Sequence, residues 1–157
     1  MLQFHVIVSL LGIVSGALVV YGLLTVRSFP GWTALFLGTT ALTSATGFLL
    51  PPFGFDPPRA VGLISLVLLG LAAAALYAFR LARAWRWIYV VTATTALYLN
   101  VFVGVTQAFQ KLPLLNELAP TQSEPPFVIA QAVVLVLFIA LGALAVIKYR
   151  PEAGVAA

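Results

Sequence analysis

Long apolar runs separated by short polar segments are the feature that most constrains the fold of this chain. A helix needs about 20 consecutive apolar residues to cross the roughly 30 Å hydrocarbon layer of a bilayer. Five stretches of the sequence meet this requirement, over residues 4–26, 32–50, 58–79, 87–109 and 127–147. The sequence therefore predicts an all-α integral membrane helical bundle of five transmembrane helices, forming a single domain over residues 1–157.

The composition excludes a water-soluble domain. Of the 157 residues, 62% are apolar and 8% are charged, whereas soluble domains are about 45–50% apolar and about 25% charged. A net charge of +4 would suggest nucleic-acid binding in a soluble protein, but these basic residues lie singly or in threes beside the apolar runs. We interpret them as topology signals and expect the lipid bilayer, not a nucleic acid, as the partner.

Prolines mark the boundaries between the predicted spans. Pro51 and Pro52 should end the second span because proline cannot continue a helix, and Pro58 suits the first turn of the third span. The one long connection is the proline-rich segment 110–126. It is either a lid over an outward-facing pocket or a short interfacial helix with a proline turn that joins two spans.

The distribution of Lys and Arg predicts the orientation of the bundle. Two basic residues, Arg59 and Lys111, lie on one side of the predicted membrane. The other side holds Arg27, Arg80, Arg83, Arg86, Lys148 and Arg150. Because cytoplasmic loops carry the excess of Lys and Arg, the N-terminus should be outside and the C-terminus inside.

Polar residues of the fourth span share one face. At 100° per residue, Asn100 projects in nearly the same direction as Gln107 and Lys111. A side-chain amide in hydrocarbon is costly without a partner, so Asn100 should face another helix or a cavity. It either bonds a neighbouring helix or lines a ligand or ion path.

A Gly12-x-x-x-Gly16 pair lies in the first span. Such a pair lets two helix backbones approach closely, but the motif is frequent in Gly-rich apolar helices. We interpret it as a packing face, and a protein partner or a second copy of the chain could use the same face.

The predicted topology gathers polar groups near the outer membrane surface, with Asn100 deeper in the bundle. These residues are the candidate ligand site: Asn100, Gln107, Lys111, Glu124, Gln131 and His5. The alternative interpretation is a solvated rim, because charged groups outside a membrane need no explanation beyond hydration.

Familiar catalytic and cofactor motifs are missing from the sequence. There is no cysteine and only one histidine, which excludes thiolate sites, an intrachain bis-His haem and an HExxH zinc site. We therefore expect no catalytic residue, no metal and no cofactor. A membrane enzyme using His5 as base, with Glu117 or Glu124 as partner, is disfavoured because chain termini fray unless they are packed.

Three segments resemble those of an uncharacterised group of small multi-pass bacterial inner-membrane proteins. They are Thr43-Ser44-Ala45-Thr46-Gly47-Phe48, Tyr98-Leu99-Asn100-Val101-Phe102-Val103 and Ala119-Pro120-Thr121-Gln122-Ser123-Glu124-Pro125-Pro126-Phe127. The resemblance extends over nearly the whole chain. It implies a location in the bacterial cytoplasmic membrane and carries over no activity, cofactor or site residue.

The sequence favours a noncatalytic accessory or scaffold component of the membrane, since small-residue faces account for most of the polar content. The alternative is a small transporter or a lipid- or ligand-binding protein with an outward-facing polar site under segment 110–126. No acidic or basic residue lies deep within a predicted span, where ion pathways usually place one.

Overall fold

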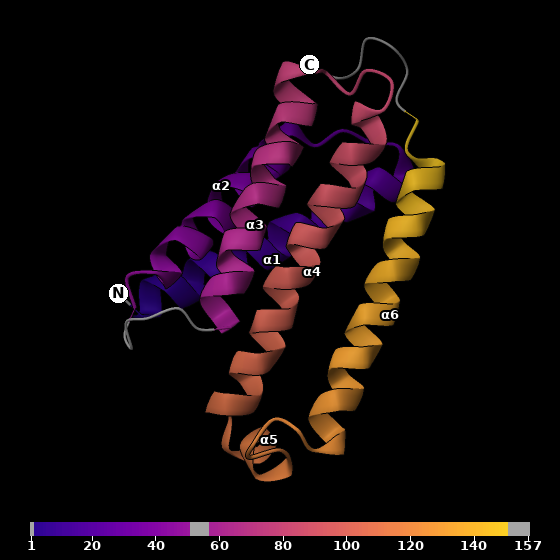
Figure 1. Cartoon of the computed structure of the whole chain (residues 1–157). Helices are drawn as coiled ribbons and strands as arrows, with labels where there is room; N and C mark the ends of the chain where they lie inside the picture. The colour runs from indigo at the N-terminus through magenta and orange to yellow at the C-terminus, as the bar shows by residue number, and fades with distance from the viewer. Residues whose placement is uncertain (1, 51–56, 151–157) are drawn as a thin grey trace.

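The computed structural model describes residues 2–50 and 57–150, and this part of the chain is helical with no strands. The elements are α1 (Leu2–Thr25), α2 (Pro30–Gly47), α3 (Pro57–Ala73), the π-helical turn η1 (Ala74–Ala78), α4 (Trp85–Lys111), α5 (Pro113–Leu118) and α6 (Pro125–Lys148) (Figure 1). The predicted all-α class is confirmed.

Four helices in the described residues are long and apolar enough to cross a membrane. They are Gln3–Thr25, Pro57–Ala78, Trp85–Lys111 and Pro125–Lys148. The predicted second span forms α2, which is not among these four. At about 1.5 Å per residue its 18 residues extend about 27 Å, and its many Thr and Ser side chains lower its hydropathy.

The second predicted span is too long at its C-terminal end. The sequence placed this end at Leu50, whereas α2 ends at Gly47. After Gly47 the chain tightens into i→i−3 bonds, from the Phe48 amide to the Ala45 carbonyl at 3.2 Å and from the Leu49 amide to the Thr46 carbonyl at 3.0 Å. Pro51 and Pro52, which were predicted to stop the helix, lie outside the described residues.

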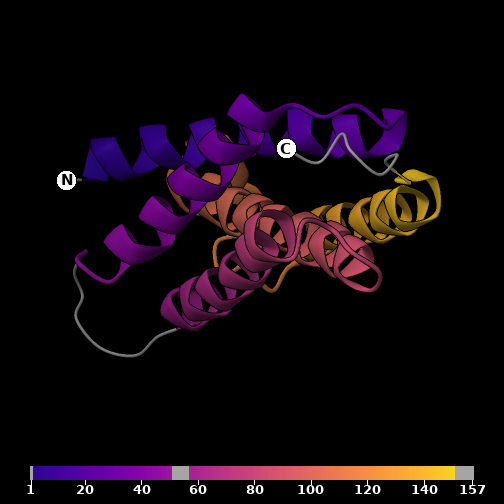
Figure 2. The same cartoon turned by 90° about the horizontal axis from the view of Figure 1, so that it is seen from above.

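The helices form two groups that cross each other. α4 lies between α3 and α6, while α1 crosses behind them obliquely and α2 returns antiparallel along α1 (Figures 1 and 2). α4 therefore contacts α1, α2, α3 and α6. Its inward face is fully buried at Val90, Ala93 and Ala96.

α6 is the least covered of the candidate spans. Ala145 is its one fully buried residue, whereas Val133, Val136 and Ile139 are each more than 60% exposed. Inside a bilayer such a surface contacts lipid or another protein chain. Exposure of apolar side chains there has no hydrophobic cost, because lipid tails are as apolar as the side chains.

Backbone irregularities gather where α3 turns into α4. The turn Ala74–Ala78 is π-helical and ends with the Phe79 amide bonded to the Ala74 carbonyl at 2.9 Å. The residues after it include Arg80, Leu81 and Arg83 with φ of 46°, 58° and 49°. Left-handed conformations of non-glycine residues cost of order 1–3 kcal/mol each and persist only where surrounding contacts hold them.

The end of α1 has the same kind of strain. Val26 has φ 56°, and the Arg27 amide bonds back to the Gly22 carbonyl at 2.9 Å, as in a Schellman C-cap. Glycine normally occupies the left-handed position of this cap, and a β-branched residue there is a genuine outlier. The loop after α1 and the loop before α4 are thus both strained.

Candidate functional sites

Asn100 is held by α1. Its side chain is 7% exposed; its Oδ1 accepts a hydrogen bond from the Ser9 hydroxyl at 3.0 Å, and its Nδ2 donates to the Ser9 carbonyl at 3.5 Å. Both bonds join α4 to α1. This geometry corresponds to the helix-bonding interpretation of Asn100.

The two glycines of the Gly-x-x-x-Gly pair face α2 and α4 of the same chain. A Cβ built at Gly12 would lie 2.9 Å from Asn100 Nδ2 and 2.9 Å from Thr40 Oγ1. One built at Gly16 would lie 2.6 Å from Leu97 Cδ1. An oligomer formed through this face would have to displace α2 and α4.

His5 is bonded to the end of α2. Its Nδ1 lies 2.9 Å from Thr46 Oγ1, and the Thr46 hydroxyl donates to the Leu42 carbonyl at 2.8 Å. Either the Thr46 hydroxyl or a protonated Nδ1 can donate in this contact, which joins α1 to α2 in both cases.

Gln131 joins α6 to α4. Its Nε2 donates to the Phe102 carbonyl and to Thr106 Oγ1, each at 3.1 Å. Its Oε1 is buried without a partner among the described residues. Like Asn100, Gln131 uses its amide nitrogen to connect two helices.

The other three predicted site residues lie at the surface of the bundle end. Gln107 donates to Gln110, which donates to Gln122, and Lys111 is exposed. The Glu124 carboxylate accepts bonds from the Thr121 hydroxyl at 2.8 Å and from the Ser123 amide at 3.1 Å. Although desolvation acts to raise the pKa of Glu124, these bonds outweigh it and lower that pKa from its ordinary value.

Segment 110–126 contains the short helix α5. Leu114 and Leu118 of this helix are exposed, and the Asn116 amide donates to the Phe109 carbonyl at 3.2 Å. This is the arrangement of the second interpretation, a short helix and a turn that join α4 to α6. The six predicted residues therefore divide into three that bond helices together, His5, Asn100 and Gln131, and three at the surface.

We expect the double substitution Lys111→Ala with Glu124→Ala to leave stability nearly unchanged. Exposed ion pairs contribute about 0–1 kcal/mol, and Glu124 is bonded within its own turn. The thermal midpoint in detergent checks this, with Lys148→Ala as a control that removes an exposed charge at the other end. Loss of complementation or ligand binding with intact expression would instead support a lid.

A cavity of about 260 Å³ lies at the opposite end of the bundle from the predicted site. Its walls come from the end of α1, the loop to α2, the start of α2, the turn η1 and the residues after it, the start of α4 and the residue after α6. The lining residues are Val19, Leu23, Arg27, Ser28, Phe29, Pro30, Thr33, Leu76, Tyr77, Arg80, Leu81, Tyr89 and Tyr149.

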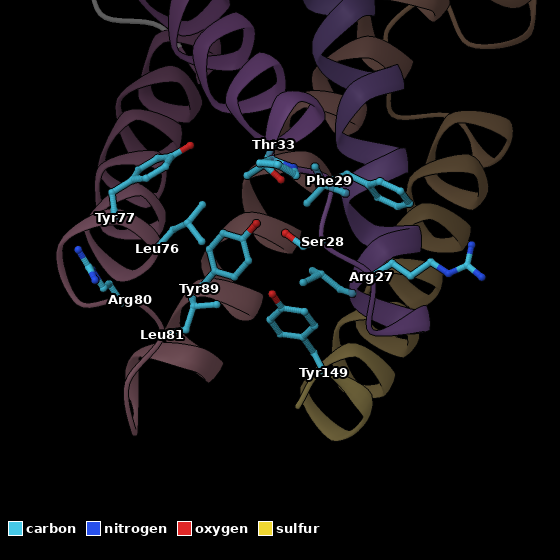
Figure 3. Close-up of a pocket in the computed structure, with 13 residues that line it drawn as sticks. Arg27, Ser28, Phe29, Thr33, Leu76, Tyr77, Arg80, Leu81, Tyr89 and Tyr149 are labelled. Carbon is cyan, nitrogen blue, oxygen red and sulfur yellow. The ribbon is translucent and has the colours of Figure 1, made fainter. Parts of the chain in front are cut away.

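Hydroxyl groups point into this cavity. Figure 3 shows the Tyr89 and Tyr149 phenols and the Ser28 hydroxyl directed toward its centre, with Thr33 above them. Tyr89 is 3% exposed, Thr33 7% and Tyr149 6%. Burial raises the pKa of the Tyr149 phenol, so this group remains a neutral hydrogen-bond donor at physiological pH.

Arg86 fixes one wall of the cavity. Its guanidinium donates to the Val146 carbonyl at 3.0 Å and to the Tyr149 carbonyl. These carbonyls belong to the last turn of α6 and the residue after it, which have no helical partners. The contact ties the start of α4 to the end of α6 and positions Tyr149 beside Tyr89, with ring centroids 6.3 Å apart.

Sequence reasoning missed this cavity because its residues come from four separated parts of the sequence, within 19–33 and 76–81 and at Tyr89 and Tyr149. The excess of Lys and Arg at this end was a usable signal, but it was interpreted as topology alone. Among the described residues, no group of three or more His, Cys, Asp or Glu side chains is placed to hold a metal. No family model, no curated protein and no solved structure matches this chain.

Proposed function

We propose that the chain is a noncatalytic accessory or scaffold protein of the bacterial cytoplasmic membrane. In this proposal α2 is a fifth span, the N-terminus is outside and the C-terminus is inside. The bacterial location rests on the sequence resemblance, and the orientation rests on the excess of Lys and Arg beside the cavity.

The path of α2 supports five spans. Its start contributes Thr33 to the cavity at one end of the bundle. At the opposite end, Thr46 bonds His5 of α1, and Ser44 lies beside Gly62 of α3. α2 therefore runs from one end of the bundle to the other, and a helix of about 27 Å nearly matches the hydrocarbon thickness.

The observation that carries the noncatalytic proposal is the way in which the side-chain amides of Asn100 and Gln131 are bonded. Asn100 bonds α1 and Gln131 bonds α4, so both act as connections between helices. Bonds of this kind contribute about 0.6–2 kcal/mol in membrane proteins. The amide nitrogens of Asn100 and Gln131 thereby have a structural use that needs no substrate.

We expect a reporter fused after Ala157 to give a cytoplasmic signal. Six of the eight Lys and Arg residues belong to the predicted inner side, and this excess sets the orientation. Matched fusions within segment 112–124 should give the opposite signal. A periplasmic signal after Ala157 would reverse the assignment of sides.

Photocrosslinking in the native membrane tests the accessory role. A photoreactive amino acid is placed in turn at Val14 of α1, Val67 of α3 and Val136 of α6, which are 57%, 58% and 65% exposed. An accessory protein should crosslink to one protein from one of these faces and to lipid from the others. Lipid products at all three positions would contradict the accessory role.

A second candidate function, ligand binding, is favoured by the cavity. The sequence placed the alternative ligand site at the outer end, under segment 110–126. The described cavity instead lies at the end that holds Arg27, Arg80 and Tyr149, so a ligand-binding function would operate from that end.

A further inference from the structure

The cavity beside Arg27 and Arg80 combines two kinds of lining. Val19, Leu23 and Leu76 supply apolar walls, while Ser28, Thr33 and three tyrosines supply hydroxyl groups. Ligand sites are typically apolar pockets with a few convergent polar groups. The lining therefore suits a molecule whose end is polar and rich in oxygen atoms.

Buried hydroxyls are the strongest feature of this lining. Tyr89, Thr33 and Tyr149 are each more than nine-tenths buried, and the two phenols point into the cavity (Figure 3). A phenol buried at such a depth normally has a hydrogen-bond partner. Tyr89 and Thr33 share a side-chain hydrogen bond, and an entering oxygen atom could extend this pair and accept a bond from the Tyr149 phenol.

The charge at the rim has one sign. Arg27 and Arg80 flank the cavity on opposite sides, with their guanidinium groups directed outward (Figure 3). None of the described residues that line the cavity is acidic. Arginine forms strong, charge-assisted hydrogen bonds with phosphate, so the rim favours a phosphate-bearing ligand.

The backbone around the rim is strained on both sides. Val26 precedes Arg27, and Arg80 and Leu81 are themselves left-handed. Leu76 and Tyr77 belong to the π-helical turn, and such turns are frequent at functional sites. These irregular segments set the places of both arginines, which an ideal α-helical continuation of α1 or α3 would put elsewhere.

The position of the cavity selects lipid over a soluble ligand. It lies at the ends of α1, η1 and α4, which are candidate membrane spans, so its mouth is at the level of the headgroups. At about 260 Å³ it is too small for a whole phospholipid but can admit part of a headgroup. Acyl chains would then lie along the exposed apolar helix surfaces.

We propose that this cavity binds the headgroup of an anionic phospholipid. The phosphate lies at the mouth between Arg27 and Arg80, whose guanidinium groups turn inward from their outward positions (Figure 3) to contact it. The polar end of the headgroup accepts and donates hydrogen bonds among Tyr89, Tyr149, Thr33 and Ser28. This goes beyond an accessory or scaffold role, and it does not depend on whether the protein has a protein partner.

Lipid titration of the full chain in a neutral detergent, followed by native mass spectrometry, tests the proposal. The probes are dioleoyl phosphatidylglycerol and dioleoyl phosphatidylcholine at equal concentration and about 0.15 M salt. One molecule of phosphatidylglycerol should bind at least about tenfold more tightly than phosphatidylcholine. Equal affinity for the two lipids would overturn the proposal.

A charge-matched pair of variants locates the site. Arg27→Gln with Arg80→Gln should weaken phosphatidylglycerol binding about tenfold or more, since it removes the charge-assisted hydrogen bonds that the guanidinium groups make to the phosphate. Arg83→Gln with Lys148→Gln removes the same charge near the same end from residues that do not line the cavity. Equal losses in both variants would show general surface attraction and overturn the site.

A second variant keeps the test decisive if the arginine variant fails to purify. Tyr89→Phe with Tyr149→Phe preserves both rings and removes the two phenol hydroxyls. Phosphatidylglycerol affinity should fall several-fold while helicity stays close to that of the unmodified protein, and the thermal midpoint without lipid falls only slightly through loss of the Tyr89–Thr33 bond. Unchanged affinity would mean that the two hydroxyls do not contact the headgroup, which contradicts the proposed placement of the headgroup in the cavity.

Soluble probes separate the two sources of phosphate. Inorganic phosphate and deacylated glycerophosphoglycerol carry the same anionic chemistry without acyl chains. At millimolar concentration neither should bind nor raise the thermal midpoint to the extent that phosphatidylglycerol does. If either matches the lipid, the site takes a soluble phosphate compound and the lipid assignment is wrong.

Discussion

Replacing Gly16 with leucine should destabilise the bundle by about 3 kcal/mol or more, the largest effect that we expect of any single substitution in this chain. A Cβ at this position would lie 2.6 Å from Leu97 Cδ1 and 2.8 Å from the Phe36 ring. Phe36 is 1% exposed and Leu97 is 3% exposed. Neither side chain has free space to move into, so the leucine would force α1 away from α2 and α4.

Gly38 supplies the matched control for this substitution. It lies within a helix like Gly16, but a Cβ built there meets nothing within 4 Å. Gly38→Leu should therefore leave stability unchanged or raise it by up to about 1 kcal/mol, because glycine is a poor helix former. Thermal or denaturant unfolding in the same detergent compares the two variants. Equal stability of both would mean that α1 does not pack on α2 and α4 as the structure has it.

The helices themselves could be predicted because a membrane constrains them so strongly. Backbone groups in hydrocarbon must bond within the chain, so an apolar run of about 20 residues has few alternatives to a helix. The ends of the first and fourth predicted spans consequently fall within about two residues of α1 and α4. The end of α2 could not be placed as well, because the shift to i→i−3 bonds after Gly47 has no sequence signature that distinguishes it from continued helix.

For contacts within the bundle, the sequence predicts which face of a helix is buried but not which residues that face contacts. The stripe through Asn100 gave the direction of that side chain, but its partner Ser9 depends on how α1 crosses α4. The crossing is set by which small residues meet, and Gly12 and Gly16 determine it through contacts with Thr40, Asn100 and Leu97. Many pairs of small-residue faces in this sequence would have satisfied the same pattern.

The cavity could not be predicted from the sequence. Its walls require the π-helical turn Ala74–Ala78 and the left-handed residues Val26, Arg80 and Leu81. None of these left-handed residues is glycine or asparagine, the residue types that most often adopt a left-handed conformation. The strain is imposed by packing between segments far apart in the chain, so local sequence rules predict ordinary helix or turn there.

Replacing Asn100 with leucine should lower the free energy of unfolding by about 0.6–2 kcal/mol. The substitution removes the bond from the Ser9 hydroxyl and the bond to the Ser9 carbonyl, and it places a branched side chain where Gly12 approaches Asn100 most closely. The lower end of the range applies if the Ser9 hydroxyl finds a carbonyl of its own helix, as Ser15 does at 2.6 Å from the Leu11 carbonyl.

A double-mutant cycle with Ser9→Ala isolates the contact between α1 and α4. Ser9→Ala removes the hydroxyl that donates to Asn100 Oδ1 but leaves the backbone carbonyl in place. If the two side chains interact directly, the double variant should lose less stability than the sum of the single variants, by about 0.6 kcal/mol or more. Unfolding in detergent measures all four proteins. A different result would favour a cavity-lining role for Asn100. In that case the stability losses of the single variants would be strictly additive, Asn100→Leu would leave stability unchanged, and the handling of a ligand would be altered.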